Sequence, residues 1–314
     1  MGAKGQTNEL RWDGRVAVIT GGGRNLGRAY AHLLAARGAR VLVNDLGVAI
    51  SDTDGEGVAP EQDLASAVVQ EILSAGGEAV ANNDSVATEA GGQAIIAQAL
   101  DAFGRVDIVI NNAGVVRQAP FARYDDERLA PVIESQIGGH FHVTRPAWPV
   151  MQSQGYGRVL NLTSGAGLWG VAEMTGYSAA KMAIVGFTRA LAQEGSAHGI
   201  TVNVVAPCAK TRPGGFGPIP ASAALNEWLS IDAVAPVIAW LVHEDCVITG
   251  ECFTVGGGYV GRVSVAINNG YRWERPLTPE SVSSNWDQIM QDDNWRPLPL
   301  GRGDLDRVLK GFNP

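Results

Sequence analysis

The chain has little lysine and no long hydrophobic run. Four of its 24 basic residues are lysine. The basic residues form no cluster, which argues against nucleic acid as a partner because phosphate binding needs concentrated positive charge. The longest apolar stretches, such as 234–242, are about half of a bilayer span. The N-terminus lacks the apolar segment of a signal peptide. We therefore expect a cytoplasmic protein without membrane or nucleic-acid partners.

Cysteine and histidine are also sparse. Cys208, Cys246 and Cys252 form no disulfide framework and fit a reducing compartment. Only two of the five histidines, His140 and His142, are close in sequence. Residues two apart on a helix point to different faces, which argues against a metal pair. We interpret both histidines as structural and expect no metal site.

Strand-like and helical segments alternate between residues 15 and 255. Runs rich in β-branched residues predict strands at 16–20, 41–44, 78–82, 106–111, 159–163, 201–206 and 252–255. Helical patterns predict helices at 26–37, 64–75, 89–103, 127–151, 177–198 and 232–243. This order predicts an α/β fold with one Rossmann-type, doubly wound parallel sheet of about seven strands and helices on both faces. Pro146 and Pro149 should bend or break the fourth helix.

The length of 314 residues and the 46% content of hydrophobic residues suit one large α/β domain. We expect a dinucleotide-binding and catalytic domain at 12–260 and a C-terminal extension at 261–314. The extension is too short for a core of its own. It should therefore pack on the domain or on a neighbouring subunit.

A glycine-rich turn joins the first predicted strand to the first helix. Gly21 and Gly27 flank Asn25, which stands where the common spacing has a glycine. Asparagine tolerates the left-handed conformation, so the turn can form. Such a turn lets the backbone approach a pyrophosphate at a helix N-terminus. The sequence therefore predicts a dinucleotide site here.

The choice of cofactor depends on two residues of opposite charge. Asp45 ends the second predicted strand, where a carboxylate binds the adenosine ribose and repels a 2′-phosphate. Arg24 lies in the glycine turn and could meet that phosphate. We favour NAD, because the Asp45 charge lies where the ribose must sit. NADP is the less favoured alternative.

Tyr177 and Lys181 are four residues apart on a predicted helix and share one face. An ammonium beside the phenol favours its phenolate form, so Tyr177 can exchange a proton with a substrate oxygen. Ser164, at the end of the fifth predicted strand, can hold the same oxygen. Because the chain prefers arginine so strongly, lysine at 181 indicates a need for a compact ammonium.

These motifs, in this order, resemble the short-chain dehydrogenase/reductase family over residues 12 to about 260. The resemblance implies that Tyr177 is the acid/base and that Lys181 also binds the nicotinamide ribose. It implies a strand-supporting role for Asn111 and a homodimer or homotetramer. The further cofactor-binding residues that it implies are Leu26, Asp84, Ser85, Asn112, Ala113, Gly114, Pro207 and Thr211.

One departure from the family concerns a helical asparagine that helps a proton relay through water. Gln136 stands at the corresponding position. Glutamine carries the same amide on a longer stem, so we expect the relay to be shifted or lost in this chain. Gln136 is the candidate fourth member of the catalytic set.

A narrower resemblance links the chain to the (3R)-hydroxyacyl-CoA dehydrogenase unit of peroxisomal multifunctional enzymes. It rests on 43–47, 81–86, 99–105, 243–246 and on tail segments between 272 and 286. It implies oxidation of a 3-hydroxyacyl-CoA with NAD, or of a related hydroxysteroid. Without hydratase and carrier domains or a peroxisomal address, we expect a stand-alone enzyme.

The substrate is expected to be a small apolar molecule of the acyl-CoA or steroid type. The residues expected to line its pocket are Leu168, Trp169, Val171, Met174 and Phe216, under a lid at 211–220. The basic residues that could meet coenzyme A phosphates are Arg117, Arg123, Lys210 and Arg212. Two other readings stay open: an NADPH-dependent 3-oxoacyl thioester reductase and a catalytically silent dinucleotide-binding regulator.

Overall fold

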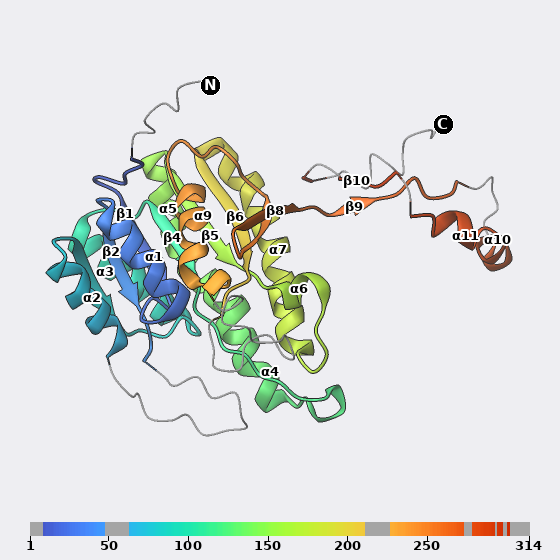
Figure 1. Ribbon diagram of the computed structural model, residues 1–314, viewed down its shortest axis with the longest axis horizontal. Coiled ribbons are helices and arrows are strands. Elements are labelled where there is room, and N and C mark those ends of the chain that lie inside the picture. The colour runs from blue at the N-terminus through green and yellow to red at the C-terminus, as the bar shows by residue number, and fades with distance from the viewer. Residues whose placement is uncertain are drawn as a thin grey trace. The chain divides into compact units, whose positions relative to one another are not determined.

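The main sheet has eight strands in the order β3-β2-β1-β4-β5-β6-β7-β8 (Figure 1). The computed structural model describes residues 9–47, 63–210, 227–272, 278–292, 294–297 and 300–301. The first seven strands are β1 (Val16–Thr20), β2 (Arg40–Asn44), β3 (Glu78–Asn82), β4 (Ile108–Asn111), β5 (Gly157–Leu162), β6 (Ile200–Pro207) and β7 (Cys252–Gly256). These seven pair in parallel. The strand order reverses between β1 and β4, where ligands of such sheets bind.

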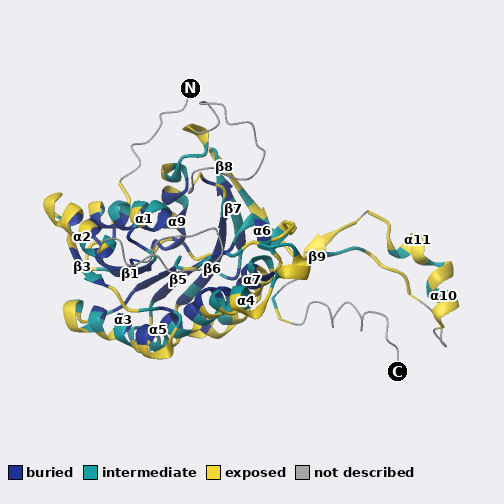
Figure 2. Cartoon of the chain, turned by 90° about the horizontal axis from the view of Figure 1, so that it is seen from below, coloured by how far each residue is buried: buried dark blue, intermediate teal, exposed yellow. Residues whose placement is uncertain are grey.

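Helices cover both faces of this sheet, as Figure 2 shows. One face carries α1 (Asn25–Ala36), α2 (Leu64–Ser74) and α9 (Ala235–Leu241), and the other carries α3 (Glu89–Phe103), α5 (Gly139–Gln154) and α7 (Thr175–Gly195). All five residues of β1 are buried, as continuous apolar strands between two helical layers require. The predicted α/β class and doubly wound parallel sheet are confirmed, and each predicted strand end lies within two residues of the observed one.

The segment predicted as one helix at 127–151 is helical throughout but changes type. It consists of α4 (Asp126–Val132), a π-helical turn η2 (Ile133–Gly138) and α5. The predicted break is wrong, since α5 runs through Pro146 and Pro149. Pro146 has no N–H for the carbonyl of His142. That carbonyl faces Gly92 of α3 so closely that an added Cβ would lie 2.2 Å from its oxygen. The carbonyl that loses its helical hydrogen bond at Pro146 therefore lies directly against the backbone of α3.

An eighth strand, β8 (Tyr259–Val263), lies beside β7 and was not predicted. Gly257 and Gly258 lie between the two strands with φ of +55° and +72°. Positive φ at both central residues is the requirement of a two-residue type I′ hairpin turn. The glycine pair was therefore the signal in the sequence that the sheet continues with an antiparallel strand.

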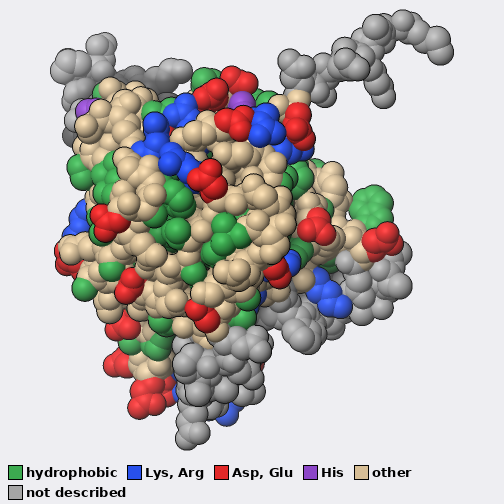
Figure 3. All heavy atoms as spheres, turned by 90° about the vertical axis from the view of Figure 1, so that its left-hand side faces the viewer, with side chains coloured by type: hydrophobic (Ala, Val, Ile, Leu, Met, Phe, Trp, Pro, Cys, Tyr) green, Lys and Arg blue, Asp and Glu red, His purple; other side chains and the backbone are tan. Residues whose placement is uncertain are grey.

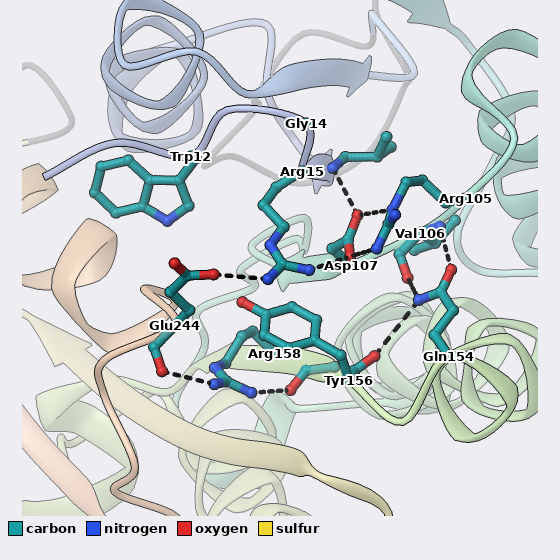
Figure 4. A network of polar contacts seen from close by, with 12 residues as sticks. Trp12, Gly14, Arg15, Arg105, Val106, Asp107, Gln154, Tyr156, Arg158 and Glu244 are labelled. Carbon is teal, nitrogen blue, oxygen red and sulfur yellow. Dashed lines mark hydrogen bonds and ion pairs between the residues drawn. The ribbon is translucent and has the colours of Figure 1, made fainter.

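A polar cluster fastens the amino ends of the strands (Figure 4). Asp107 is completely buried and forms ion pairs with Arg15 at 3.2 Å and with Arg105 at 2.6 Å. The guanidinium carbons of Arg15 and Arg158 lie 3.8 and 4.3 Å from the centre of the Tyr156 ring. The predicted site lies at the other, carboxyl ends of these strands, so we interpret this cluster as a structural clamp.

On the face drawn in Figure 3, acidic and basic side chains are interspersed among apolar ones. Arg28 pairs with Glu71, and Arg15 with Glu244, each at 2.7 Å. Within the described ranges, no helix combines the length and apolar character needed to cross a membrane. The same part of the chain contains no group of three or more metal-ligating side chains.

The chain forms two compact units, residues 1–262 and 263–314. In the second unit, β9 (Ala266–Ile267) and β10 (Arg296–Pro297) pair antiparallel, with α10 (Pro279–Ser284) and α11 (Trp286–Ile289) between them in sequence. The side-chain amide of Asn268 donates to the carbonyl of Ile289 at 2.8 Å. What the extension packs against remains a prediction.

Candidate functional site

The glycine turn after β1 is fastened to the end of β4. The Thr20 Oγ1 accepts the backbone N–H groups of Asn112 at 3.0 Å and Ala113 at 3.1 Å. The Asn112 amide donates to the carbonyl oxygens of Thr20 and Gly21, both at 3.0 Å. A Cβ at Gly21 would lie 2.9 Å from the Ala113 Cα. The structure thus brings together three residues that were predicted to bind the cofactor.

The first turn of α1 has the form that a phosphate site needs. Asn25 has a φ of +48°, the left-handed conformation for which asparagine was considered suitable. A Cβ at Gly27 would lie 2.2 Å from the Gly21 carbonyl oxygen, so the helix packs directly on the turn. The N-cap residue Arg24 makes no side-chain capping hydrogen bond. The N–H groups that begin this helix, including that of Leu26, therefore suit a pyrophosphate.

Asp45 lies against the same turn at the end of β2. Its carboxylate accepts the backbone N–H of Gly23 at 3.0 Å and that of Gly47 at 2.9 Å. The residue is 8% exposed. A carboxylate has about four acceptor positions, so two backbone bonds leave capacity for the two hydroxyls of an adenosine ribose. The site therefore fits a dinucleotide, and this charge opposes a 2′-phosphate.

Asp84 and Ser85 follow β3 and are held by neighbouring asparagines. The Asn82 amide donates to the Asp84 carboxylate at 2.7 Å, and the Asn44 amide donates to the Asp84 carbonyl at 2.8 Å. The Ser85 hydroxyl accepts the Ala87 N–H at 3.2 Å. These bonds join the ends of β2 and β3, which places both residues at the same edge of the sheet as Asp45.

Tyr177 and Lys181 lie one turn apart at the start of α7. Lys181 is 4% exposed, and its Nζ donates to the Leu162 carbonyl at 2.7 Å. The Nζ lies 5.7 Å from the centroid of the Tyr177 ring. Burial lowers the pKa of Lys181 to about 7. The predicted pair is therefore a buried lysine beside a phenol, and the protonated form of this lysine favours phenolate.

Ser164 is the N-cap of a short helix that was not predicted, α6 (Gly165–Trp169). Its Oγ accepts the Ala166 N–H at 3.2 Å, which leaves the hydroxyl hydrogen to donate elsewhere. The preceding Thr163 donates to the Lys181 carbonyl at 2.6 Å. A Cβ at Gly167 would lie 2.7 Å from the Lys181 Cβ, so α6 packs directly on this turn of α7. The structure thus places Ser164 beside the Tyr177–Lys181 turn.

Gln136 lies in the π-helical turn and is 2% exposed. Its Nε2 donates to the Val115 carbonyl at 3.0 Å. A Cβ at Gly114 would lie 2.3 Å from that nitrogen, so the amide covers the glycine directly. Helical turns of this type are frequent at functional sites. The side chain reaches the loop after β4, which joins it to the predicted cofactor residues Asn112 to Gly114.

A groove of about 530 Å³ is lined in part by Tyr124. Tyr124 connects it to the residue before Tyr177, because a Cβ at Gly176 would lie 2.6 Å from the Tyr124 hydroxyl oxygen. Arg128 and Asp125 both line the groove and pair with each other at 2.5 Å. The other lining residues are Gln118, Ala119, Pro120, Ala122, Arg123 and Tyr124. The Tyr124 hydroxyl also donates to the backbone carbonyl of Arg117 at 3.5 Å. Arg117 is one of the basic residues expected to meet coenzyme A phosphates.

The remaining predicted residues differ in how far they are buried, and some of them are not described by the structure. Leu168 and Met174 are half-buried, whereas Trp169 is 71% and Val171 49% exposed. Pro207 ends β6 at the carboxyl edge of the sheet, and Lys210 is exposed nearby. Thr211, Arg212, Phe216 and the expected lid at 211–220 lie outside the described residues.

Sequence reasoning missed a buried polar network below the site. The Asn111 amide donates to Thr144 Oγ1 and Asn161 Oδ1, and the Asn161 amide donates to Thr188 Oγ1, all at 2.9 Å. This network joins β4 and β5 to α5 and α7, which carries Lys181. Asparagine inside an apolar strand was the available signal, because a buried amide needs a partner.

Comparison with known proteins agrees with this geometry. The sequence model of the short chain dehydrogenase family matches residues 15–212. The chain is 41% identical over 296 residues to mouse peroxisomal multifunctional enzyme type 2, which covers 91% of this chain and 38% of the mouse enzyme. It is 36% identical over 252 residues to the 3-oxoacyl-[acyl-carrier-protein] reductase of Synechocystis, covering 78% of this chain and 97% of the reductase.

A solved structure is similar over nearly the whole chain. Full-length peroxisomal multifunctional enzyme type 2 from Drosophila melanogaster superposes with a TM-score of 0.79 at 30% identity. The match covers 96% of this chain and 49% of the Drosophila chain. The chain therefore spans about half of that protein and a smaller share of the mouse enzyme.

Proposed function

Because the chain belongs to the short-chain dehydrogenase/reductase family, we propose that it is an NAD-dependent dehydrogenase of 3-hydroxyacyl-CoA. The chain is an oxidoreductase that acts on CH–OH groups with a nicotinamide cofactor. The choice of substrate rests on the likeness to a multifunctional enzyme, which extends over 91% of this chain. The Synechocystis relative is by name a reductase of 3-oxoacyl thioesters. It supports a substrate with a hydroxyl or oxo group at carbon 3 of an acyl thioester.

Asp45 supports NAD as the cofactor. Its carboxylate is fixed by two backbone N–H groups and is 8% exposed. The carboxylate cannot rotate away from a 2′-phosphate without losing both of these hydrogen bonds. Two hydroxyl donors of a ribose, by contrast, match its remaining acceptor positions.

The reaction divides among three side chains of this chain. When bound, the nicotinamide ring accepts or supplies the hydride. In the oxidative direction, the Tyr177 phenolate takes the proton of the substrate hydroxyl. Ser164 donates its hydroxyl hydrogen to the same substrate oxygen, because its own oxygen already accepts from Ala166. Lys181, buried and bound to the Leu162 carbonyl, supplies the positive charge that stabilises the phenolate.

The groove beside Tyr177 supports a large, phosphate-bearing substrate. It measures about 530 Å³ and includes Arg123 and Arg128. Guanidinium groups suit the phosphates of coenzyme A. Tyr124 joins this groove to Gly176 and hence to Tyr177. A thioester placed at Tyr177 would therefore have room for its carrier on the side of Arg123.

The test is a substrate screen with 3-hydroxyacyl-CoA of several chain lengths and with steroid alcohols, using NAD and NADP in parallel. We expect the highest kcat/KM with a 3-hydroxyacyl-CoA and NAD. Tyr177→Phe is the matched control, because it removes only the acid/base oxygen, and turnover should fall by about 10³-fold. Steroid alcohols as the best substrates, or no turnover of any thioester, would contradict the proposal.

A variant of the groove tests the coenzyme A part separately. Arg123→Ala should raise KM for acyl-CoA several-fold more than KM for a small 3-oxo ester without phosphates. Trp228→Ala, an exposed residue outside that groove, is the control and should affect neither KM. Equal effects of Arg123→Ala on both substrates would remove the coenzyme A argument.

The second candidate is an NADPH-dependent 3-oxoacyl thioester reductase. Arg24 in the glycine turn and the likeness to the Synechocystis reductase favour it. The same screen decides between the two, since this candidate requires a higher kcat/KM with NADPH than with NADH in the reductive direction.

A further inference from the structure

His140 is a buried histidine for which the proposed chemistry has no role. It lies on α5, one turn after Gln136, and is 2% exposed. Its Nδ1 lies 2.5 Å from the Gln136 carbonyl oxygen. A carbonyl can only accept, so Nδ1 carries the hydrogen. In the neutral ring Nε2 is then a bare acceptor.

Two buried acceptors therefore lie on the same turn. Among the described residues, neither His140 Nε2 nor Gln136 Oε1 has a hydrogen-bond partner. Both side chains are held in place by their other polar atom, since Gln136 Nε2 donates to Val115. Buried polar atoms in folded proteins nearly always have partners, so each of these two orphaned acceptors points to a donor nearby.

Lys181 of α7 is a buried cation, only 4% exposed. An ammonium has three N–H donors, and one of them is directed to the Leu162 carbonyl. Burial and, next, the positive charge of Lys181 lower the pKa of His140 to about 3. The ring therefore stays neutral at physiological pH. It meets Phe187 of α7 edge-on, with centroids 6.3 Å apart, so it packs against the helix that carries Lys181.

We propose that His140 is a positioning residue for the reaction, which fixes the Gln136 carbonyl through Nδ1 and offers Nε2 as an acceptor to the Lys181 ammonium through one bridging water. The proposal rests on the roles proposed above for Tyr177 and Lys181. In this chain, His140 would thus support Lys181 next to the position where Gln136 replaces the family's asparagine.

The consequence concerns the charge of Lys181. An acceptor beside a buried ammonium favours the protonated form, which in turn favours the Tyr177 phenolate. Lys181 and Tyr177 are the titratable groups of α7 on this side, and His142 of α5 turns away to the Val86 carbonyl at 2.9 Å. Loss of the His140 acceptor should therefore make the phenolate harder to form.

The first experiment compares His140→Phe, which keeps a ring but has no acceptor, with His140→Gln, which keeps one. We expect His140→Phe to move the acidic limb of kcat/KM against pH upward by about one unit and to lower kcat about tenfold, with KM within twofold. His140→Gln should restore most of both. His243→Phe, which replaces a histidine that is 5% exposed at the opposite end of the sheet, is the control for a lost buried imidazole. An unchanged limb in His140→Phe would overturn the proposal.

A second measurement does not depend on turnover or on a known substrate. ¹⁵N NMR of the histidine rings should show His140 with a protonated Nδ1 and a bare Nε2. The Nε2 resonance should shift in Lys181→Met, whereas that of His243 should not. If the Nε2 resonance does not shift in Lys181→Met, the proposed contact between His140 and Lys181 is contradicted, even if the enzyme is active. A shift without any turnover would keep the contact and contradict the proposed function instead.

Discussion

The Asp45 carboxylate accepts the Gly23 backbone N–H at 3.0 Å, so the acidic residue that follows β2 is bonded directly to the glycine turn that follows β1. A Cβ at Gly23 would lie 2.8 Å from the same carboxylate oxygen. The turn and the acid therefore form one unit. The residue predicted to bind the ribose is thus hydrogen-bonded to the backbone turn predicted to bind the pyrophosphate.

Asp45→Ser should shift the cofactor preference from NAD towards NADP. The serine hydroxyl can still accept one backbone N–H but carries no charge against a 2′-phosphate. We expect the ratio of kcat/KM with NAD to that with NADP to fall by about 100-fold, or about 2.7 kcal/mol. Arg24→Ala, which removes the neighbouring positive charge, is the control and should raise the ratio. A ratio unchanged by Asp45→Ser would show that the carboxylate does not select the cofactor.

Asn25→Gly should be tolerated, whereas Asn25→Ala should destabilise the protein. The residue has a φ of +48°, which an alanine adopts at a cost of about 1–2 kcal/mol and glycine adopts freely. Urea unfolding of the two variants measures the difference directly. Because the strained residue begins α1, Asn25→Ala should also weaken binding of the dinucleotide. Equal stability of both variants would mean that the turn relaxes to another conformation.

Asp107→Asn tests whether the clamp in Figure 4 is purely structural. The carboxylate is fully buried, accepts the Val16 N–H at 2.9 Å and pairs with Arg15 and Arg105. Removing its charge takes the buried counterion from Arg105 and leaves Arg15 with Glu244 alone, which should lower the free energy of unfolding by about 3 kcal/mol. Since the cluster lies at the amino ends of the strands, kcat and KM should stay within twofold at 20 °C. A large loss of kcat in a folded variant would contradict the structural interpretation.

Most of the sheet was predictable because its strands are buried on both faces and their apolar runs are continuous. Each predicted strand corresponds to an observed one, from β1 to β7. β8 was missed because Tyr259 to Val263 is mostly exposed and has no apolar run. The short α6 was missed because five residues cannot show a helical period, although Ser164 caps it.

The candidate site was predictable where a residue type is required by its chemistry, as for Tyr177, Lys181 and Asp45. It was not predictable where tertiary contacts decide. The sequence cannot show that Gln136 lies over Gly114 or that His140 bonds the Gln136 carbonyl, because both depend on the π-helical turn at 133–138. The error at Pro146 concerns a tertiary contact as well, since the His142 carbonyl lies against Gly92 of α3.

Lys181→Met should change how stability depends on pH. In the folded protein the pKa of Lys181 is lowered to about 7, against an ordinary value of 10.5. Between these values the unfolded chain binds the proton and the folded chain does not, so this residue makes the free energy of unfolding rise with pH. Its share of the slope is at most about 1.4 kcal/mol per pH unit. Below pH 7 the lysine is charged in both states, and its burial lowers stability by a constant amount.

Methionine has a similar length and no charge, so Lys181→Met should remove this slope and be more stable than the native chain near pH 7. Urea unfolding at pH 7, 8 and 9 without cofactor measures the difference between the two proteins, in which the other titrating groups cancel. We expect the difference to shrink as the pH rises, because the native lysine loses its charge. A difference that stays constant from pH 7 to 9 would show that Lys181 keeps its proton when buried, held by stronger acceptors than the Leu162 carbonyl alone.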